Sequence, residues 1–302
     1  MRRGQRFTPV RLRRWLESGR GTGFGANYQP WHQVTRADPG SRGRSHLING
    51  RLSRQHHLLS DGEEEAFGFA TMLPGLSDLR EQHPLSTEDC IGDDVAAACL
   101  TGSPWIEGTL SIASALGLKH PTVHKAGDCE PWRLSTDLVL HLDTPSGTSE
   151  VIAVSVKQSD ELKRQRTLEL LQIEREYWAR QGVTWILLTE QLYAKDVGLS
   201  IRAGLSWTLG QPQALAAHLN LCAALAPAFE GRTLGAVLAL IEQRFAVSQE
   251  SAQAIFWQSV WRGDTPINLA MSVRPGATFE MLSATSFWQQ NPIAARRSAW
   301  TL

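Results

Sequence analysis

The sequence lacks the long apolar run that a membrane span requires. None of its 302 residues lies in an apolar stretch approaching the roughly 20 residues that cross a bilayer. The basic residues 1–6 are also not followed by the apolar segment of a secretory signal. We therefore expect no membrane partner and a cytoplasmic location.

Cysteine is scarce and scattered along the chain. None of the four cysteines forms a CxxC pair, which argues against structural disulfides and favours a reducing compartment. The histidines and cysteines also match no standard zinc spacing, so we expect no zinc site. The residues considered for such a site were His56, His57, His120, His124, Cys90, Cys99 and Cys129.

Charge is unevenly distributed, although the formal net charge is zero. Residues 1–57 contain twelve arginines and no lysine against two acids, Glu17 and Asp38, whereas residues 58–110 contain eleven acids and one base, Arg80. Guanidinium groups bind phosphate through paired hydrogen bonds, so the arginine-rich arm is suited to contact DNA. Two alternatives stay open: the arm solubilises the chain, or it pairs with the acidic block of the same chain.

The length and an apolar fraction of 42% allow two globular domains, and we expect three parts. Residues 1–45 are rich in Gly, Arg, Ser and Pro, which predicts an irregular arm. Residues 46–195 alternate helix and strand patterns, which predicts an α/β domain. Residues 196–302 show three helical patterns and then a hairpin pattern, the order of an α+β winged-helix domain.

Within the α/β domain, Ser60 and Glu63 have the spacing of a capping box and predict the start of a helix. Residues 145–147 have the turn chemistry of a hairpin between two strand-like runs. The expected elements are a helix over 60–72, an extended segment over 76–85, a helix over 104–118, strands over 134–142 and 150–157, a helix over 160–181 and a buried strand over 183–189.

The C-terminal part would read DNA through its third helix if it is a winged-helix domain. Gln253, Gln258 and Arg262 on that helix are the candidate DNA contacts. The helix is not notably basic, so a protein-binding role is equally open. The expected elements are helices over 213–229, 234–245 and 248–262, and two short strands within 265–282 around a turn at 274–276.

Asp137 and Lys157 form the strongest candidate site. Lys157 ends a strand-like apolar run, Ser155 shares its face of the strand, and Asp137 near the start of the preceding strand can reach the same edge. Carboxylates bind Mg²⁺, and an ammonium group orients water and balances the charge of a phosphoryl transition state. The pattern indicates metal-dependent phosphodiester hydrolysis, with Glu63 as a second carboxylate. By spacing alone, such a pair also occurs as solvated surface charge.

Six stretches within about residues 28–190 carry a resemblance to a known family. They are His57–Glu63, Asp78–Leu85, His120–Pro121, Ser135–Leu138, Val154–Lys157 and Tyr177–Trp178 leading to Trp185–Glu190. With these stretches in the order of the family, and with Arg80–Leu85 as the most specific of them, the chain resembles the TnsA family, the endonuclease subunits of heteromeric cut-and-paste transposases.

The resemblance implies a restriction-endonuclease-like (PD-(D/E)xK) domain followed by a winged-helix domain. It implies that Glu63, Asp137 and Lys157 are catalytic, and that Glu63, Asp137 and Ser155 hold Mg²⁺ or Mn²⁺. Ser155 stands where relatives often have Gln, so its backbone carbonyl is the alternative ligand. Within the most specific stretch, we expect Arg80 and Gln82 to contact DNA.

The resemblance also implies partners: double-stranded DNA at transposon ends, a DDE-type transposase and an AAA+ ATPase regulator. The chain would cut the 5′ strand at each end, while the transposase cuts and joins the 3′ strand. Two other functions stay open. One is a standalone restriction or repair nuclease with the same core, and the other is a non-catalytic DNA-binding assembly subunit.

Overall fold

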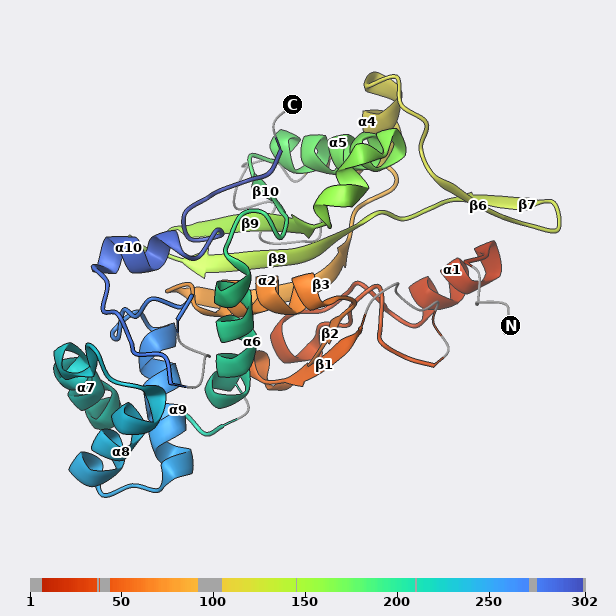
Figure 1. Cartoon of the computed structure of the whole chain (residues 1–302). Helices are drawn as coiled ribbons and strands as arrows, with labels where there is room; N and C mark the ends of the chain where they lie inside the picture. Colours follow the sequence, from red (N-terminus) through yellow and green to blue (C-terminus); the bar gives the residue numbers. More distant parts are fainter. Residues whose placement is uncertain are drawn as a thin grey trace, which may run out of the picture. The chain divides into compact units, whose positions relative to one another are not determined.

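The structure is a computed structural model whose described residues form two compact units (Figure 1). Unit 1 is built from Met1–Glu63 and Gly75–Thr189, and unit 2 from Glu64–Pro74 and Glu190–Thr301. None of the described helices is long and apolar enough to cross a membrane. The described residues are 7–36, 38, 44–91, 105–144, 146–209, 211–271 and 276–300.

Unit 1 is organised around a four-stranded mixed sheet with the order β10-β9-β8-β3. Neighbouring strands β3, β8 and β9 are antiparallel, whereas β10 runs parallel to β9. The predicted α/β class and the predicted hairpin of the two central strands are therefore confirmed. The strands are β3 (Leu76–Pro84), β8 (Ser135–Asp143), β9 (Ser149–Val156) and β10 (Thr184–Leu188).

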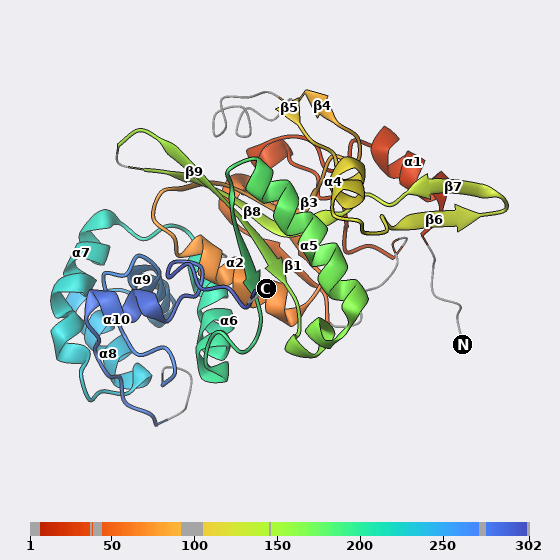
Figure 2. The same cartoon turned by 90° about the horizontal axis from the view of Figure 1, so that it is seen from above.

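Helix α5 (Gln165–Arg180) connects the parallel strands β9 and β10 and covers one face of the sheet (Figure 2). Its apolar stripe, which includes Ile173 and Trp178, packs with Val139 of β8 and Ala153 of β9 in one buried cluster. A parallel pair needs such a crossover, and its helix buries the apolar side chains of the sheet. The helix is preceded by a 3-10 turn, η3 (Ser159–Lys163).

The predicted helix at Ser60 is present as α2 (Asp61–Thr71), and the Ser60 hydroxyl accepts from Glu63 N at 3.1 Å. The helix predicted over 104–118 is shorter than expected. It begins only at Thr109 as α4 (Thr109–Ala115), because β5 (Trp105–Ile106) pairs with β4 (Cys90–Ile91). Residue 104 of that prediction lies outside the described residues.

The expectation of an irregular N-terminal arm is wrong for residues 9–17, which form the amphipathic helix α1 (Pro9–Glu17). Leu12 and Trp15 of α1 are buried in a cluster with Trp31 and Val123. Burial of this apolar face outweighs the Gly- and Arg-rich composition on which the prediction depended. Sequence analysis also missed two hairpins and two 3-10 turns, which are β1 (His46–Asn49) with β2 (Gln55–Leu58), β6 (Thr122–Lys125) with β7 (Asp128–Pro131), η1 (Gly25–Asn27) and η2 (Arg51–Ser53).

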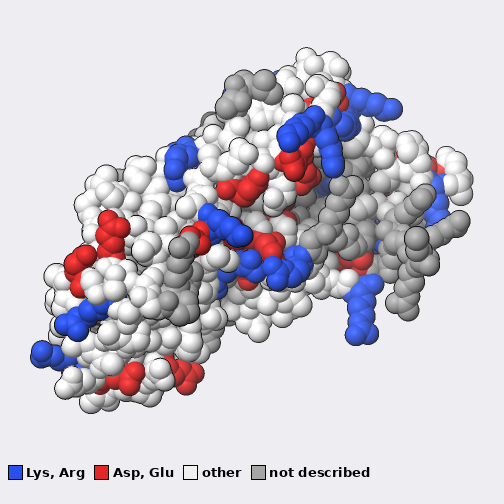
Figure 3. All heavy atoms as spheres, in the orientation of Figure 1, with Lys and Arg blue, Asp and Glu red and all other residues white. Residues whose placement is uncertain are grey.

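Among the described residues, Arg44 and Arg54 of the N-terminal 57 residues pair with acids of the block 58–110, as one of the open alternatives predicted. Arg13 and Arg20 instead pair with acids outside that block. On the face drawn in Figure 3, basic and acidic side chains are interspersed rather than gathered into separate blocks. The two opposite charge blocks of the sequence are thus partly neutralised in the fold. The pairs are Arg13 with Asp128 and Glu130, Arg20 with Asp38, Arg44 with Asp61 and Arg54 with Glu81.

The Arg54–Glu81 pair is buried, with side chains 6% and 0% exposed. Arg54 donates to both carboxylate oxygens of Glu81 at 2.6 and 2.7 Å, and His56 Nδ1 lies 3.1 Å from Glu81 Oε2. Burial alone would raise the pKa of Glu81, but the hydrogen bonds from His56 and Arg54 outweigh it and hold the pKa at about 2. Glu81 is therefore an ionised group that ties the β1–β2 hairpin to β3.

Unit 2 is helical, and helix α9 lies at its centre. Every residue of α9 from Ala252 to Trp261 except Gln253 is buried, and α6, α7 and α8 all contact it. Gly204 of α6 permits this packing, because a Cβ there would lie 2.6 Å from Trp261 and 2.7 Å from Trp257. The helices are α6 (Lys195–Leu209), α7 (Ala216–Leu225), the 3-10 turn η4 (Ala226–Phe229), α8 (Leu234–Phe245), α9 (Gln249–Trp261) and α10 (Ala284–Gln289).

Unit 2 contains two isolated antiparallel bridges among its described residues. One joins Ile267 to Met281 and the other joins Thr233 to Thr278. Most of the predicted turn, Arg274 and Pro275, lies outside the described residues. The three helices are confirmed, and α6 and α10 are helices that the sequence did not predict. The winged-helix assignment stays a prediction.

Replacing Glu81 by Gln should destabilise the protein strongly, because it leaves the buried Arg54 guanidinium without its counter-charge. We expect the free energy of unfolding in urea to fall by about 3 kcal/mol or more. The matched control is Glu176→Gln on α5, which removes one partner of the solvent-accessible Arg180 pair and should cost at most about 0.5 kcal/mol. Equal losses for both variants would contradict the structural role given to Glu81.

A matched pair of glycine substitutions tests the packing of unit 2. Gly204→Ala places a methyl group against Trp257 and Trp261 and should reduce the unfolding free energy by about 1–3 kcal/mol. Gly235→Ala adds the same methyl group to α8, where nothing lies within 4 Å, and should be neutral or stabilise by up to about 1 kcal/mol. Thermal unfolding of both variants checks the sign of each change.

Candidate active site

Asp137 lies where the pairing between β8 and β9 ends, since the last paired residues are Leu138 and Val154. Beyond that point, Val156 N donates to Asp137 Oδ2 at 2.7 Å instead of to a strand carbonyl. Lys157 Nζ donates to the same oxygen at 3.1 Å. Divergence of the strands thus leaves a carboxylate and an ammonium group facing one another at the edge of the sheet.

Lys157 is fixed from both ends. Its backbone N–H donates to Leu188 O at 3.1 Å, and its Nζ also donates to Val156 O at 2.8 Å. Burial alone would lower the pKa of Lys157, but the carboxylates of Asp137 and Glu174 outweigh this effect and raise it. Lys157 is therefore a cation and a hydrogen-bond donor at neutral pH, not a base.

Glu63 reaches the same place from the first turn of α2. Its Oε2 accepts from Leu59 N at 2.9 Å, and the Ser60 hydroxyl donates to its Oε1 at 3.2 Å. Only 7% of Glu63 is exposed. Burial, followed by the charge of Asp137, raises the pKa of Glu63 well above its usual range. The helix start that the capping box predicts therefore also places this carboxylate.

Gln82 joins the two carboxylates. Its Nε2 donates to Glu63 Oε2 at 2.9 Å and lies 3.4 Å from Asp137 Oδ1 as a second, longer hydrogen bond. Gln82 has a φ of +50° inside β3, a conformation that is unusual for a residue with a side chain. Trp31 N donates to its carbonyl oxygen at 3.1 Å and helps to hold this backbone. We expected Gln82 to contact DNA, but its amide lies between the catalytic candidates.

Ser155, the expected third metal ligand, has a different environment. It is fully buried, and its hydroxyl donates to Glu174 Oε1 at 2.5 Å and accepts from Trp185 Nε1 at 2.9 Å. The Thr136 hydroxyl donates to the same Glu174 oxygen at 2.6 Å. The side chain of Ser155 thus orients Glu174, and its role as a metal ligand stays a prediction.

Glu174 of α5 is a candidate site residue that sequence analysis missed. It is 7% exposed, and it interacts electrostatically with both Lys157 and Asp137. Burial raises the pKa of Glu174 to about 7 against the opposing charge of Lys157. A signal was present in the sequence: Glu174 lies at helical spacing from the apolar Leu171 and Trp178, and a carboxylate on a buried stripe needs a partner.

Two of the expected DNA contacts are inaccessible in this structure. Arg80 is 3% exposed, donates to Asp78 at 2.8 Å and lies 3.9 Å from the centre of the Phe24 ring. Gln258 is 7% exposed and hydrogen-bonds to the backbone of the α6–α7 connection. A DNA backbone cannot reach these buried groups in this structure.

The other two candidates on α9 are nearer the surface. Gln253 is partly buried and accepts from Trp257 Nε1 at 3.1 Å. Arg262 is exposed and lies 2.9 Å from Asp264. Their contact with DNA stays a prediction.

Comparison with known proteins relates this site to one family. A family described as "TnsA-like endonuclease N terminal" matches residues 101–190. The transposition protein TnsA of transposon Tn7 from Escherichia coli is 32% identical over 202 residues, which cover 67% of this chain and 63% of that protein. Both matches support a TnsA-type protein. The alignment covers slightly less than two thirds of the length of this relative.

The matched segment of the TnsA-like chain contains Asp137, Lys157 and Glu174. Glu63 and Gln82 precede this segment in the sequence. Helix α2 carries Glu63, and strand β3 carries Gln82. The site is therefore assembled from three stretches of unit 1 that are distant in sequence. The resemblance that the sequence motifs indicated is confirmed by both comparisons.

The arrangement suits a hard divalent cation. Glu63 and Asp137 present carboxylate oxygens that are bridged by a single amide nitrogen, and Mg²⁺ prefers one or two carboxylates together with water. The charge of Asp137 contributes to the raised pKa of the buried Glu63 carboxyl, and a bound cation would remove this repulsion. The donor set therefore fits the expected Mg²⁺ or Mn²⁺.

The raised pKa of Glu63 makes a prediction about stability and pH. The pKa of Glu63 is about 8 in the folded state, and that of an unfolded glutamate is about 4.3. Between these two pH values the unfolded state releases the proton more readily, so the folded state becomes less stable as pH rises. Glu63→Gln removes this cost. In metal-free buffer, the variant should therefore gain stability relative to the parent protein between pH 5 and pH 9, by at least about 1 kcal/mol.

The measurement is urea denaturation at both pH values in the presence of a chelator. Glu169→Gln on α5 is the control, because Glu169 forms a solvent-accessible pair with Arg166. A difference between Glu63→Gln and the parent that does not change with pH would show that Glu63 is ionised in the folded state.

Proposed function

We propose that the chain is a metal-dependent DNA endonuclease and the strand-cutting subunit of a transposase. It would cut the 5′ strand at transposon ends together with a DDE-type transposase and an AAA+ ATPase regulator. The observation that carries the proposal is the convergence of Glu63, Asp137 and Lys157 at one sheet edge in a TnsA-like chain. A mixed sheet with this edge supports a restriction-endonuclease-like core.

Glu63 and Asp137 would hold Mg²⁺ or Mn²⁺, and Gln82 would keep their separation. When bound, the cation would lower the pKa of its water and polarise the phosphate. Lys157 Nζ donates hydrogen bonds and stays protonated, so it would orient the attacking water or a non-bridging phosphate oxygen and balance the developing negative charge. The proton of the water must go to another acceptor.

Glu174 would act as a positioning residue for Lys157. Its Oε1 is fixed by the hydroxyls of Thr136 and Ser155. Its charge, like that of Asp137, contributes to the raised pKa of Lys157. The usual ligand position on β9 is occupied by the short side chain of Ser155, so we propose that Glu174 supplies the carboxylate function from α5.

We propose that unit 2 binds partner proteins and does not recognise a DNA sequence. We propose that it is the winged-helix domain, because α7, α8 and α9 precede the bridge between Ile267 and Met281 in the expected order. Its α9 packs among α6, α7 and α8, whereas a recognition helix must offer side chains to a DNA groove. A surface for partner proteins is the function that this arrangement favours.

Strand cleavage in a reaction reconstituted with both partner proteins tests the proposal. Asp137→Ala and Lys157→Ala should each slow 5′ cutting by about 10²–10⁴-fold, the usual contribution of a positioned catalytic group. Chelation of divalent cations should abolish cutting by the parent protein. Glu174→Gln should reduce the rate by roughly tenfold, with Lys163→Gln, an exposed lysine paired with Asp160, as the unaffected control.

The same reaction separates the alternatives. A standalone restriction or repair nuclease would cut DNA without the partners, whereas the proposed subunit should be a poor nuclease alone. Undiminished 5′ cutting by Asp137→Ala and Lys157→Ala would make the chain a non-catalytic assembly subunit. A gene for an integrase-like transposase beside the gene of this chain is expected.

A further inference from the structure

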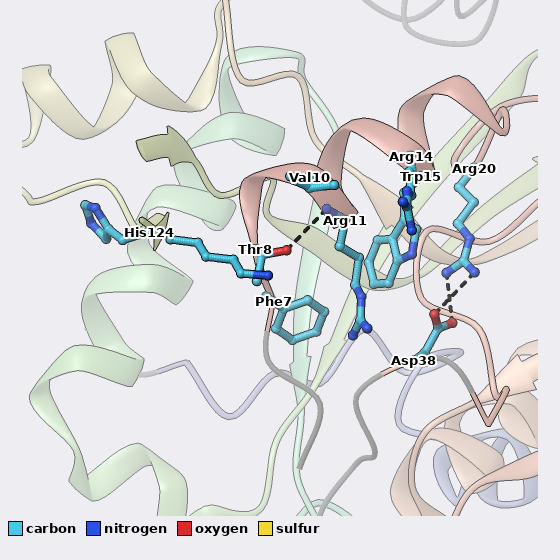
Figure 4. Close-up of a pocket in the computed structure, with 10 residues that line it drawn as sticks. Phe7, Thr8, Val10, Arg11, Arg14, Trp15, Arg20, Asp38 and His124 are labelled. Carbon is cyan, nitrogen blue, oxygen red and sulfur yellow. Dashed lines mark hydrogen bonds and ion pairs between the residues drawn. The ribbon is translucent and has the colours of Figure 1, made fainter. Parts of the chain in front are cut away.

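A basic pocket of about 740 Å³ lies between α1 and the β6–β7 hairpin of unit 1 (Figure 4). Figure 4 shows Arg11 extending from α1 beside the rings of Phe7 and Trp15. Four of the ten lining residues are cationic, and the single acid, Asp38, pairs with Arg20 at 2.8 Å. The cationic lining residues are Arg11, Arg14, Arg20 and Lys125.

Helix α1 is held firmly against the hairpin. The Thr8 hydroxyl caps the helix by accepting from Arg11 N at 3.3 Å. Arg13 pairs with Asp128 and, at 3.1 Å, with Glu130, so a single arginine engages both acids of β7. These acids are consequently unavailable to neutralise the pocket.

Two cations of the pocket have no ion-pair partner within the described part of the chain. Arg14 and Lys125 are both exposed, and neither lies within salt-bridge distance of a carboxylate there. A site that gathers several cations, two of them without an ion-pair partner among the described residues, attracts a polyanion.

The pocket is connected to the catalytic residues through an aromatic layer. The rings of Phe7 and Trp15 lie 5.7 and 5.4 Å from the ring of His32. Burial lowers the pKa of His32 to about 4, and the charge of Asp137 acts on it in the opposite direction. His32 is therefore a neutral ring within electrostatic range of Asp137. Beside it, Trp31 N donates to the carbonyl oxygen of Gln82.

We propose that this pocket binds the phosphate backbone of duplex DNA beside the phosphate that is cut. The inference rests on the proposed nuclease function, because the DNA bound in the pocket would be the DNA that is cut at Asp137 and Lys157. Phosphates recur about every 3.4 Å of rise along each strand. A strand cut at Asp137 and Lys157 therefore carries further phosphates outward from the site. Arg14 and Lys125 would each contact one of them.

An acidic segment of a partner protein is the competing occupant. DNA is favoured because the cationic pocket is linked to the candidate nuclease site through Trp31 and Gln82 in one compact unit. Arginine and lysine on an open surface also bind backbone phosphates without reading sequence. Binding to duplex of arbitrary sequence should therefore reveal the contact.

The test measures binding of the full chain to a fluorescent duplex of arbitrary sequence at several salt concentrations, with a chelator to prevent cutting. Arg14→Gln/Lys125→Gln should lower the slope of log affinity against log salt concentration by about 1.8, because each phosphate contact contributes about 0.9. Affinity at about 0.1 M salt should fall by one to two orders of magnitude. Arg14→Lys should retain most of the slope.

The control variant Lys119→Gln/Arg244→Gln removes the same charge from two exposed positions outside the pocket. It should keep the parent slope. A parent-like slope for Arg14→Gln/Lys125→Gln would overturn the inference while leaving the nuclease proposal untouched, since that depends on cleavage by Asp137 and Lys157. Loss of binding to a labelled peptide of eight aspartates, with duplex binding unchanged, would overturn it in favour of an acidic protein segment.

Discussion

The candidate active site of unit 1 is organised around the contact between Asp137 and Lys157, at the point where the pairing of β8 and β9 ends. Strand pairing would otherwise satisfy Val156 N, and its hydrogen bond to the Asp137 carboxylate is possible only because the pairing has ended. The other residues of the site interact with one or both of these two side chains. Gln82 connects Glu63 to it, and Glu174 adds a second negative charge near Lys157.

The position of Gln82 in the site is held by neighbouring side chains that are not themselves part of the site. Glu81, which immediately precedes Gln82, is bound by Arg54 and His56 inside unit 1. The left-handed backbone of Gln82 is unfavourable by itself and persists where neighbouring contacts fix both sides of it. Buried charge therefore keeps a strained residue in the position where its amide is needed.

Sequence alone predicted the central hairpin, the crossover helix and the start of α2, because each has a strong local signal: turn residues, a helical stripe or a capping box. It also predicted that Glu63, Asp137 and Lys157 come together, whereas their catalytic roles stay a proposal. It missed α1 because its burial depends on Trp31 and Val123, which are distant in sequence. It did not predict the place of the Gln82 amide between Glu63 and Asp137 for the same kind of reason, since a backbone with positive φ is imposed by tertiary contacts. Glu174 could have been found as a lone carboxylate on an apolar helical stripe.

The shared hydrogen bond of Ser155 and Glu174 has an evolutionary consequence. The two side chains fill one buried space between β9 and α5, together with Trp185. A longer residue at position 155 would displace the carboxylate at 174, and a shorter one at 174 would leave room for an amide at 155. The two positions are therefore expected to change together among related chains, so that one carboxylate or amide always faces the lysine.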